Sequence, residues 1–182
     1  MTTKNIAVNL STEIQSVIRD IPDFPKPGII FKDITPFLAN GPLFCQTINH
    51  FAERYRNHRL DAIVGIEARG FIFASALAYA LGIGCVPIRK KGKLPGQISQ
   101  VSYQLEYGYD TLEIHKDQLP ADARVVLIDD VLATGGTILA SYELLINLSI
   151  EVVEVAFLME LLFLKGSKKL NQIPFYSLVQ YH

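Results

Sequence analysis

The chain has 182 residues, of which 49% are hydrophobic, and its formal net charge is −1 at pH 7. This length suffices for one well-buried domain and is short for two, so we expect residues 1–182 to form a single domain. Acidic and basic residues are interleaved and nearly balanced, so the chain lacks the cationic stripe typical of nucleic-acid binding, and we expect no nucleic-acid partner.

The N-terminal segment predicts a helix followed by an extended stretch. Apolar residues recur at helical spacing over residues 14–21. Thr12 and Gln15 can form a capping box at the start of this helix, and Pro22 would end it. Four prolines within residues 22–37 exclude a regular helix, so we expect an ordered, extended segment there.

Short apolar runs that alternate with helical segments predict a central sheet. Helical spacing recurs over residues 44–55, and the apolar or β-branched runs that follow span residues 62–66, 84–89, 124–128 and 152–158. This alternation is typical of the α/β class, with a mostly parallel twisted sheet flanked by helices and joined by right-handed crossovers. Such sheets bind ligands beyond the carboxyl ends of their strands, so residues 67–70 and the Asp129-Asp130 pair should face one crevice.

Residues 90–110 combine lysines, glycines and tyrosines without a sustained period. A long loop inside a compact domain is usually functional or disordered. We favour a mobile lid, because Lys90, Lys91 and Lys93 would repel one another unless an anion joined them. A solvated hairpin of basic residues is the alternative.

Residues 125–137 are the most informative segment. Four apolar residues lead into two acids and then a Thr-Gly-Gly-Thr turn, which indicates a buried strand and a helix start that can bind an anion. The carboxylates of Asp129 and Asp130 suit ribose hydroxyls, whereas the threonine hydroxyls and glycine amides suit phosphate oxygens. No lysine follows the glycines, as a nucleoside triphosphate loop would require. The pattern favours a sugar phosphate over a receiver-like acidic strand or a plain glycine turn.

The patterns of cysteine, histidine and hydropathy argue against a disulfide-linked, a metal-binding and a membrane-spanning protein. Cys45 and Cys85 are far apart, so we expect two core thiols in a reducing compartment. The four histidines form no pair at ligand spacing, so we expect no protein-bound metal. Residues 70–88 are apolar but interrupted by polar residues, glycine and proline, which indicates a buried helix and strand rather than a membrane span. With no apolar signal core at the N-terminus, we expect a cytoplasmic protein without membrane contact.

Taken together, these motifs resemble the type I phosphoribosyltransferases nearly end to end, and most closely their adenine-specific members. The resemblance rests on residues 23–36, 67–71, 89–96, 105–108 and 133–137. The last segment is shared with transcription regulators of the same fold, whereas Phe-Pro-Lys-Pro-Gly-Ile and Glu-Tyr-Gly are close to diagnostic of the adenine-specific enzymes. The resemblance implies a type I phosphoribosyltransferase fold with a small N-terminal hood at 22–37 and a mobile lid at 90–110. It also implies purine salvage, in which ribose 5-phosphate passes from phosphoribosyl pyrophosphate to N9 of adenine, giving AMP and pyrophosphate.

Site residues follow from the same resemblance, position by position. The 5-phosphate is expected on Ala133, Thr134, Gly135, Gly136 and Thr137, and the ribose hydroxyls on Asp129 and Asp130. Arg69, with backbone groups of Ala68 and Gly70, would hold pyrophosphate or lie edge-on to the base. Arg89 and Lys93 would add cations to the pyrophosphate, with Arg89 acting across a dimer interface. Adenine would be bound by Ile30, Phe31, Lys32 and Val131. Glu106 would exchange a proton with N7 of the base, and Tyr107 would help to close the site.

The resemblance further implies Mg²⁺, held mainly by substrate oxygens, and a homodimer. Two positions depart from the usual pattern. Ala68 stands where serine is common, which removes a hydroxyl donor, and Lys32 stands where arginine is also common, which removes bidentate pairing. Two alternatives stay open: a non-catalytic regulator, which should carry an added basic DNA-binding module, and a sister enzyme for xanthine or hypoxanthine.

Overall fold

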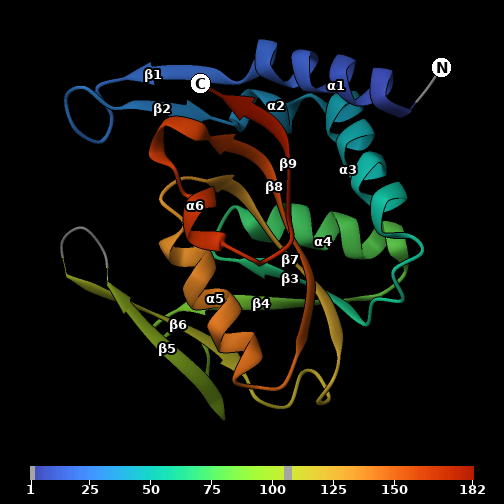
Figure 1. The fold of residues 1–182 in the computed structure, drawn as a ribbon, viewed down its shortest axis with the longest axis vertical. Coiled ribbons are helices and arrows are strands. Elements are labelled where there is room, and N and C mark those ends of the chain that lie inside the picture. Colours follow the sequence, from blue (N-terminus) through green and yellow to red (C-terminus); the bar gives the residue numbers. More distant parts are fainter. Residues whose placement is uncertain (1–2, 105–107) are drawn as a thin grey trace. The chain divides into compact units, whose positions relative to one another are not determined.

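The computed structural model describes residues 3–104 and 108–182 of the chain (Figure 1). The chain divides into two compact units, Met1–Glu53 and Arg54–His182. The first unit contains α1 (Thr3–Val17), β1 (Arg19–Pro22), β2 (Ile30–Asp33), α2 (Thr35–Ala39) and most of α3 (Gly41–Tyr55). The second unit contains the large sheet and the helices that cover it.

Part of the proline-rich segment forms an antiparallel hairpin of β1 and β2, as an extended segment would, but the exclusion of a helix over residues 22–37 is wrong at its end, where α2 begins at Thr35. Across the hairpin the Lys32 ammonium lies 2.6 Å from Asp20 Oδ1. The rings of Phe24 and Phe31 pack edge to face, with centroids 5.2 Å apart. Pro36 occupies the first turn of α2, where a missing N–H has no helical partner to lose.

The predicted first helix is wrong at both ends. Thr12 lies inside α1, and its hydroxyl donates a hydrogen bond to the Val8 carbonyl at 3.0 Å instead of capping the helix. The helix ends at Val17 because the next residues pair with β2 in the hairpin, where Ile21 opposes Phe31. Tertiary pairing therefore overrides the helical spacing of the last two isoleucines.

Within residues 54–104 and 108–182, seven strands form one sheet in the order β5-β6-β4-β3-β7-β8-β9. Their bounds are β3 (Ala62–Ile66), β4 (Gly84–Lys90), β5 (Ile98–Gln104), β6 (Tyr109–His115), β7 (Arg124–Leu132), β8 (Glu151–Leu161) and β9 (Phe175–Tyr181). The neighbouring pairs β4–β3, β3–β7, β7–β8 and β8–β9 are parallel, whereas β6 pairs antiparallel with β4 and with β5. The four predicted strands and the mostly parallel sheet are confirmed, and β5, β6 and β9 were not predicted.

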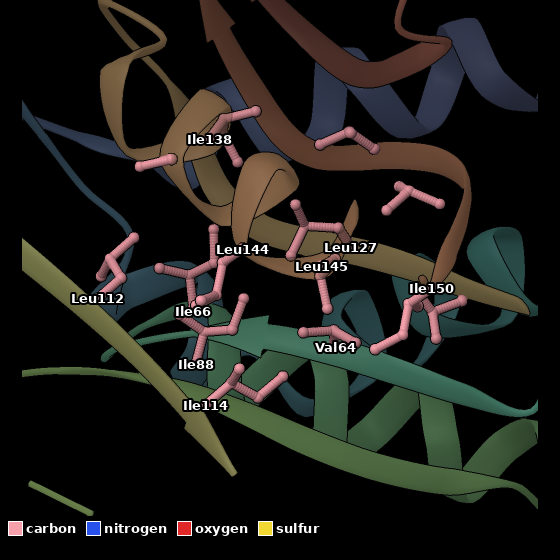
Figure 2. Packing of buried hydrophobic residues seen from close by; sticks show 14 of the residues in the cluster. Val64, Ile66, Ile88, Leu112, Ile114, Leu127, Ile138, Leu144, Leu145 and Ile150 are labelled. Atoms are coloured by element: carbon pink, nitrogen blue, oxygen red, sulfur yellow. The ribbon is translucent and has the colours of Figure 1, made fainter. Parts of the chain in front are cut away.

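Helices cover both faces of this sheet, as predicted. α4 (Gly70–Leu81) connects β3 to β4 and packs on β3 and β7, while α5 (Gly136–Ile146) connects β7 to β8 and packs on β5, β6 and β8. Val64 and Ile66 share a buried cluster with Leu144 and Leu145 of α5 (Figure 2). Gly65 faces the other way, because a Cβ added there would lie 2.6 Å from the Cβ of Ala74 in α4. The connection between β8 and β9 contains η1 (Leu162–Leu164) and α6 (Ser167–Leu170).

The prediction of two core thiols is wrong, because Cys45 and Cys85 are both exposed. Cys85 lies on β4, whose alternation directs Val86 and Ile88 inward and Cys85 outward. Among the residues that the structure describes, none of the helices combines the length and apolar character that a membrane span requires.

Candidate functional site

A cavity of about 620 Å³ lies at the carboxyl ends of β3 and β7, inside the second unit. Residues 67–69 line one side of it and residues 129–138 another. Lys90, Tyr103, Asp110 and Leu112 complete the lining. The two polar loops expected to face one crevice therefore do so.

The loop after β7 enters α5 through a glycine pair. Gly135 has a φ of +79°, which glycine adopts at little cost, and Gly136 begins the helix. No side chain among the described residues caps this helix start, so its first N–H groups are available to an anion. All five residues expected to cradle a phosphate line the cavity, namely Ala133, Thr134, Gly135, Gly136 and Thr137.

Gly166, in the connection between β8 and β9, packs against this loop backbone to backbone. A Cβ added at Gly166 would lie 3.0 Å from the Ala133 carbonyl carbon, 3.1 Å from the Gly135 nitrogen, and would overlap the Ala133 oxygen. Conversely, a Cβ at Gly135 would lie 2.9 Å from the Gly166 oxygen. Sequence reasoning missed Gly166, because it is a single glycine about thirty positions after Gly135 and belongs to no motif.

Asp129 and Asp130 lie near the end of β7, beside the cavity. Asp129 Oδ1 accepts the backbone N–H of Asp130 at 2.9 Å. The Arg69 Nε lies 2.9 Å from Asp130 Oδ2. Asp130 is only 2% exposed, and no described residue donates a hydrogen bond to its Oδ2, so the Arg69 contact is an ion pair without hydrogen-bond alignment.

The acid pair is electrostatically unusual. Burial, together with the neighbouring charge of Asp130, raises the pKa of Asp129 well above its usual range. Burial also raises the pKa of Asp130, and the Arg69 guanidinium opposes that rise. Asp130, which is buried, and Asp129, which is half-buried, are acceptors that hydroxyl donors from a ligand would stabilise.

The turn after β3 carries Glu67, Ala68 and Arg69 to the cavity, and α4 begins at Gly70. A Cβ added at Gly70 would lie 2.8 Å from the Ile128 carbonyl oxygen and 3.0 Å from Asp129 Oδ1, so glycine permits the close approach of this turn to the acid pair.

Glu67 connects this turn to the end of β4. Its Oε2 accepts the backbone N–H of Lys90 at 2.9 Å and the Nε of Arg89 at 3.3 Å. Burial alone would raise the pKa of Glu67, but these donors outweigh it and hold the pKa below its usual range. Of the described cationic residues, Arg69 and Lys90 line the cavity, whereas Arg89 and Lys93 do not. Sequence reasoning placed Lys90 in the lid, with Lys91 and Lys93 around an anion, and did not include it among the residues that bind the substrate.

Residues 98–104 and 109–110 of the predicted lid lie in the β5–β6 hairpin, whose strands contain no lysine, so it differs from the hairpin of basic residues that was the alternative. The turn before β5 is fastened to β6. The Lys91 N–H donates to the Thr111 carbonyl at 3.0 Å, and the Gly92 N–H donates to both carboxylate oxygens of Glu113, at 2.9 and 3.0 Å. Glu113 is 3% exposed, so this anchor is buried. Lid mobility stays a prediction.

The residues predicted to bind adenine belong to both units. Ile30, Phe31 and Lys32 lie on β2 in the first unit, whereas Val131 lines the cavity in the second. Glu106 and Tyr107 lie outside the described residues. In residues 3–104 and 108–182, no three His, Cys, Asp or Glu residues group as metal ligands.

Comparisons with known proteins agree on one family. The phosphoribosyl transferase domain matches residues 37–178. An adenine phosphoribosyltransferase of Roseiflexus sp. (strain RS-1) is 56% identical over 172 residues, which cover 94% of this chain and 100% of that protein.

Solved structures give the same result. The adenine phosphoribosyltransferase of Thermoanaerobacter pseudethanolicus is 50% identical, with a TM-score of 0.89 over 93% of this chain and 99% of that one. The enzyme of Saccharomyces cerevisiae, solved with an imino-altritol bisphosphate and adenine, is 42% identical, with a TM-score of 0.89 over 94% of this chain and 99% of that one.

Proposed function

This chain belongs to the type I phosphoribosyltransferase family, among its adenine phosphoribosyltransferases, and from this membership we propose which residues carry the reaction. The activity is purine salvage, which forms AMP from adenine and phosphoribosyl pyrophosphate. The bond from ribose C1 to pyrophosphate breaks, a bond from C1 to N9 of adenine forms, and adenine gives up one proton.

The 5-phosphate and the ribose bind at the end of β7. The uncapped start of α5 supplies backbone N–H groups, and Thr134 and Thr137 add hydroxyls, for the phosphate oxygens. Asp129 and Asp130 accept the ribose hydroxyls. Support for this part of the proposal comes from the buried Asp130 Oδ2, which receives no hydrogen bond from the described residues.

Basic side chains are proposed to bind the pyrophosphate leaving group. Positive charge develops at C1 as the bond to pyrophosphate stretches, so the enzyme must hold both ends of the substrate and stabilise the departing anion. Arg69 is proposed to hold the pyrophosphate together with the backbone at Ala68 and Gly70, and Arg69 and Ala68 line the cavity. When pyrophosphate draws Arg69 away from Asp130, the released carboxylate can accept a ribose hydroxyl. Arg89 and Lys93 are proposed to add cations, with Arg89 acting across a homodimer interface.

Adenine is proposed to lie against Ile30, Phe31, Lys32 and Val131. The 6-amino group is a donor, so backbone acceptors near Ile30 would select adenine over a 6-oxopurine. Glu106 accepts a proton from N7 as N9 bonds to C1, and Tyr107 helps to close the site.

Mg²⁺ is proposed to enter as part of the substrate, chelated by pyrophosphate and ribose oxygens, and to offset charge on the leaving group. The carboxylates of Asp129 and Asp130 would support the metal ion only through the bound sugar, because both are proposed to accept ribose hydroxyls. We further propose that residues 1–182 act as one catalytic domain, in a cytoplasmic homodimer.

This proposal depends on the acid pair, with its buried Asp130, lying in one cavity with the uncapped glycine turn, so its test is Asp130→Asn. The variant retains the shape of the side chain and loses its charge. We expect phosphoribosyl pyrophosphate to bind about tenfold more weakly in calorimetry, since hydrogen bonds to charged groups contribute about 1.5–3 kcal/mol. The exposed Asp117→Asn is the matched control and should bind as the wild type does.

A purine panel tests the rest of the proposal. Turnover of adenine, but not of hypoxanthine or xanthine, is expected with phosphoribosyl pyrophosphate. Preference for a 6-oxopurine would indicate the sister enzyme, and binding without turnover would indicate a regulator. Unchanged affinity in Asp130→Asn would remove the acid pair from ribose recognition.

A further inference from the structure

Tyr103 on β5 extends over the proposed phosphate cradle although it belongs to the hairpin. Its half-buried side chain lines the cavity. A Cβ added at Gly136 would lie 3.9 Å from the Tyr103 ring carbon Cδ2, so the ring covers the first residue of α5. The Tyr103 hydroxyl lies 3.3 Å from the hydroxyl of Thr137.

The Tyr103 hydroxyl has weakly placed partners in this structure. It donates to Asp110 Oδ2 at 3.4 Å, and the Lys90 Nζ lies 3.5 Å from the same oxygen. These distances exceed the 2.5–3.0 Å of well-formed O–H···O bonds. A phosphate oxygen would be a stronger acceptor, because its charge shortens and strengthens the hydrogen bond.

An acidic residue beside a phosphate site also needs an explanation. Asp110 lines the same cavity and would repel a bound phosphate if its charge were unbalanced. The Lys90 ammonium offsets that charge, and the carboxylate accepts from Tyr103. Burial raises the pKa of Tyr103, so the phenol keeps its proton and can donate at neutral pH.

We propose that the Tyr103 hydroxyl is a further ligand of the substrate's 5-phosphate, acting beside Thr137, while Asp110 and Lys90 orient it. Two hydroxyls 3.3 Å apart can each reach an oxygen of one phosphate group, since each O–H···O bond spans about 2.5–3.0 Å. This inference rests on the proposed placement of the 5-phosphate at residues 133–137. It adds a donor from the hairpin to a site otherwise built from one loop.

The test compares AMP with adenosine, which lacks the phosphate, in calorimetry on full-length wild type and Tyr103→Phe. The variant retains the ring and loses only the hydroxyl. We expect its Kd for AMP to rise about tenfold, equivalent to about 1.4 kcal/mol, with its Kd for adenosine unchanged. Tyr109→Phe, on the same hairpin and 77% exposed, is the matched control and should bind both compounds as the wild type does.

The outcomes separate this inference from the proposed function. Unchanged AMP binding in Tyr103→Phe, or equal weakening of AMP and adenosine, would overturn the phosphate-ligand role of Tyr103. A wild type that does not prefer AMP to adenosine would instead overturn the placement of the phosphate at residues 133–137. A urea unfolding midpoint equal to that of the wild type verifies that the variant folds.

Discussion

Replacing Gly166 by alanine tests whether the phosphate cradle is set by the backbone packed beneath it. The φ of Gly166 is −59°, which alanine adopts without strain, so the added methyl group is the only perturbation. That methyl group would overlap the Ala133 carbonyl oxygen and crowd the Gly135 nitrogen, and no flexible side chain can yield there. The two backbones must therefore separate by about 1 Å, at a cost of about 1–3 kcal/mol in stability.

A displacement of that size moves the donors of the cradle away from the substrate. Misplacement by about 1 Å can lower a rate by about 100-fold, so we expect kcat/KM for phosphoribosyl pyrophosphate to fall by that order at saturating adenine. Steady-state kinetics and urea unfolding on the same preparation measure both effects. Gly41→Ala is the control, because nothing lies within 4 Å of the added methyl group. A folded Gly166→Ala enzyme with wild-type kcat/KM would refute the reasoning.

Three further changes probe charges. Burial raises the pKa of Asp129, so ionisation of this carboxyl above about pH 4 opposes folding. Asp129→Asn should therefore have a higher urea unfolding midpoint than the wild type at pH 7, and the difference should vanish in acid. An unchanged midpoint at pH 7 would contradict this. Burial alone would raise the pKa of Glu154, but hydrogen bonds from the Arg54 guanidinium and the Tyr55 hydroxyl lower it. Glu154→Gln should therefore lower the free energy of unfolding by about 1–3 kcal/mol at neutral pH, and by less as the pH falls. Equal losses at pH 7 and pH 4 would exclude the Glu154 charge as the cause. Finally, Glu106→Gln should slow single-turnover AMP formation more than it weakens phosphoribosyl pyrophosphate binding, and an unaltered rate would remove Glu106 from the chemistry.

The features that sequence predicted best are local ones. The strand, acid pair and glycine turn of residues 125–137 lie within one short segment, so their order along the chain already determines their arrangement in space. The run of β3 is equally easy to recognise, because a strand covered on both faces is apolar throughout. The position of the cavity follows from the parallel topology of these strands.

The features that sequence missed depend on contacts between distant segments. Gly166 meets the cradle only because the β8–β9 connection passes beneath it, and no local pattern encodes that approach. Ile98–Gln104 forms a strand, but the lysines, glycines and tyrosines of residues 90–110, which follow no sustained period, favoured a loop. Tyr103 gains its place through the pairing of this strand with β6, which composition alone does not indicate.

The turn between β4 and β5 has a consequence for binding kinetics. The backbone amides of Lys90 and Gly92 donate hydrogen bonds to the carboxylates of Glu67 and Glu113, respectively. The turn is thus preorganised. The conformational entropy of its backbone is lost when the protein folds, so ordering the turn does not weaken the binding of an anion. Neutralising either carboxylate should therefore slow capture of pyrophosphate without altering what the captured anion contacts.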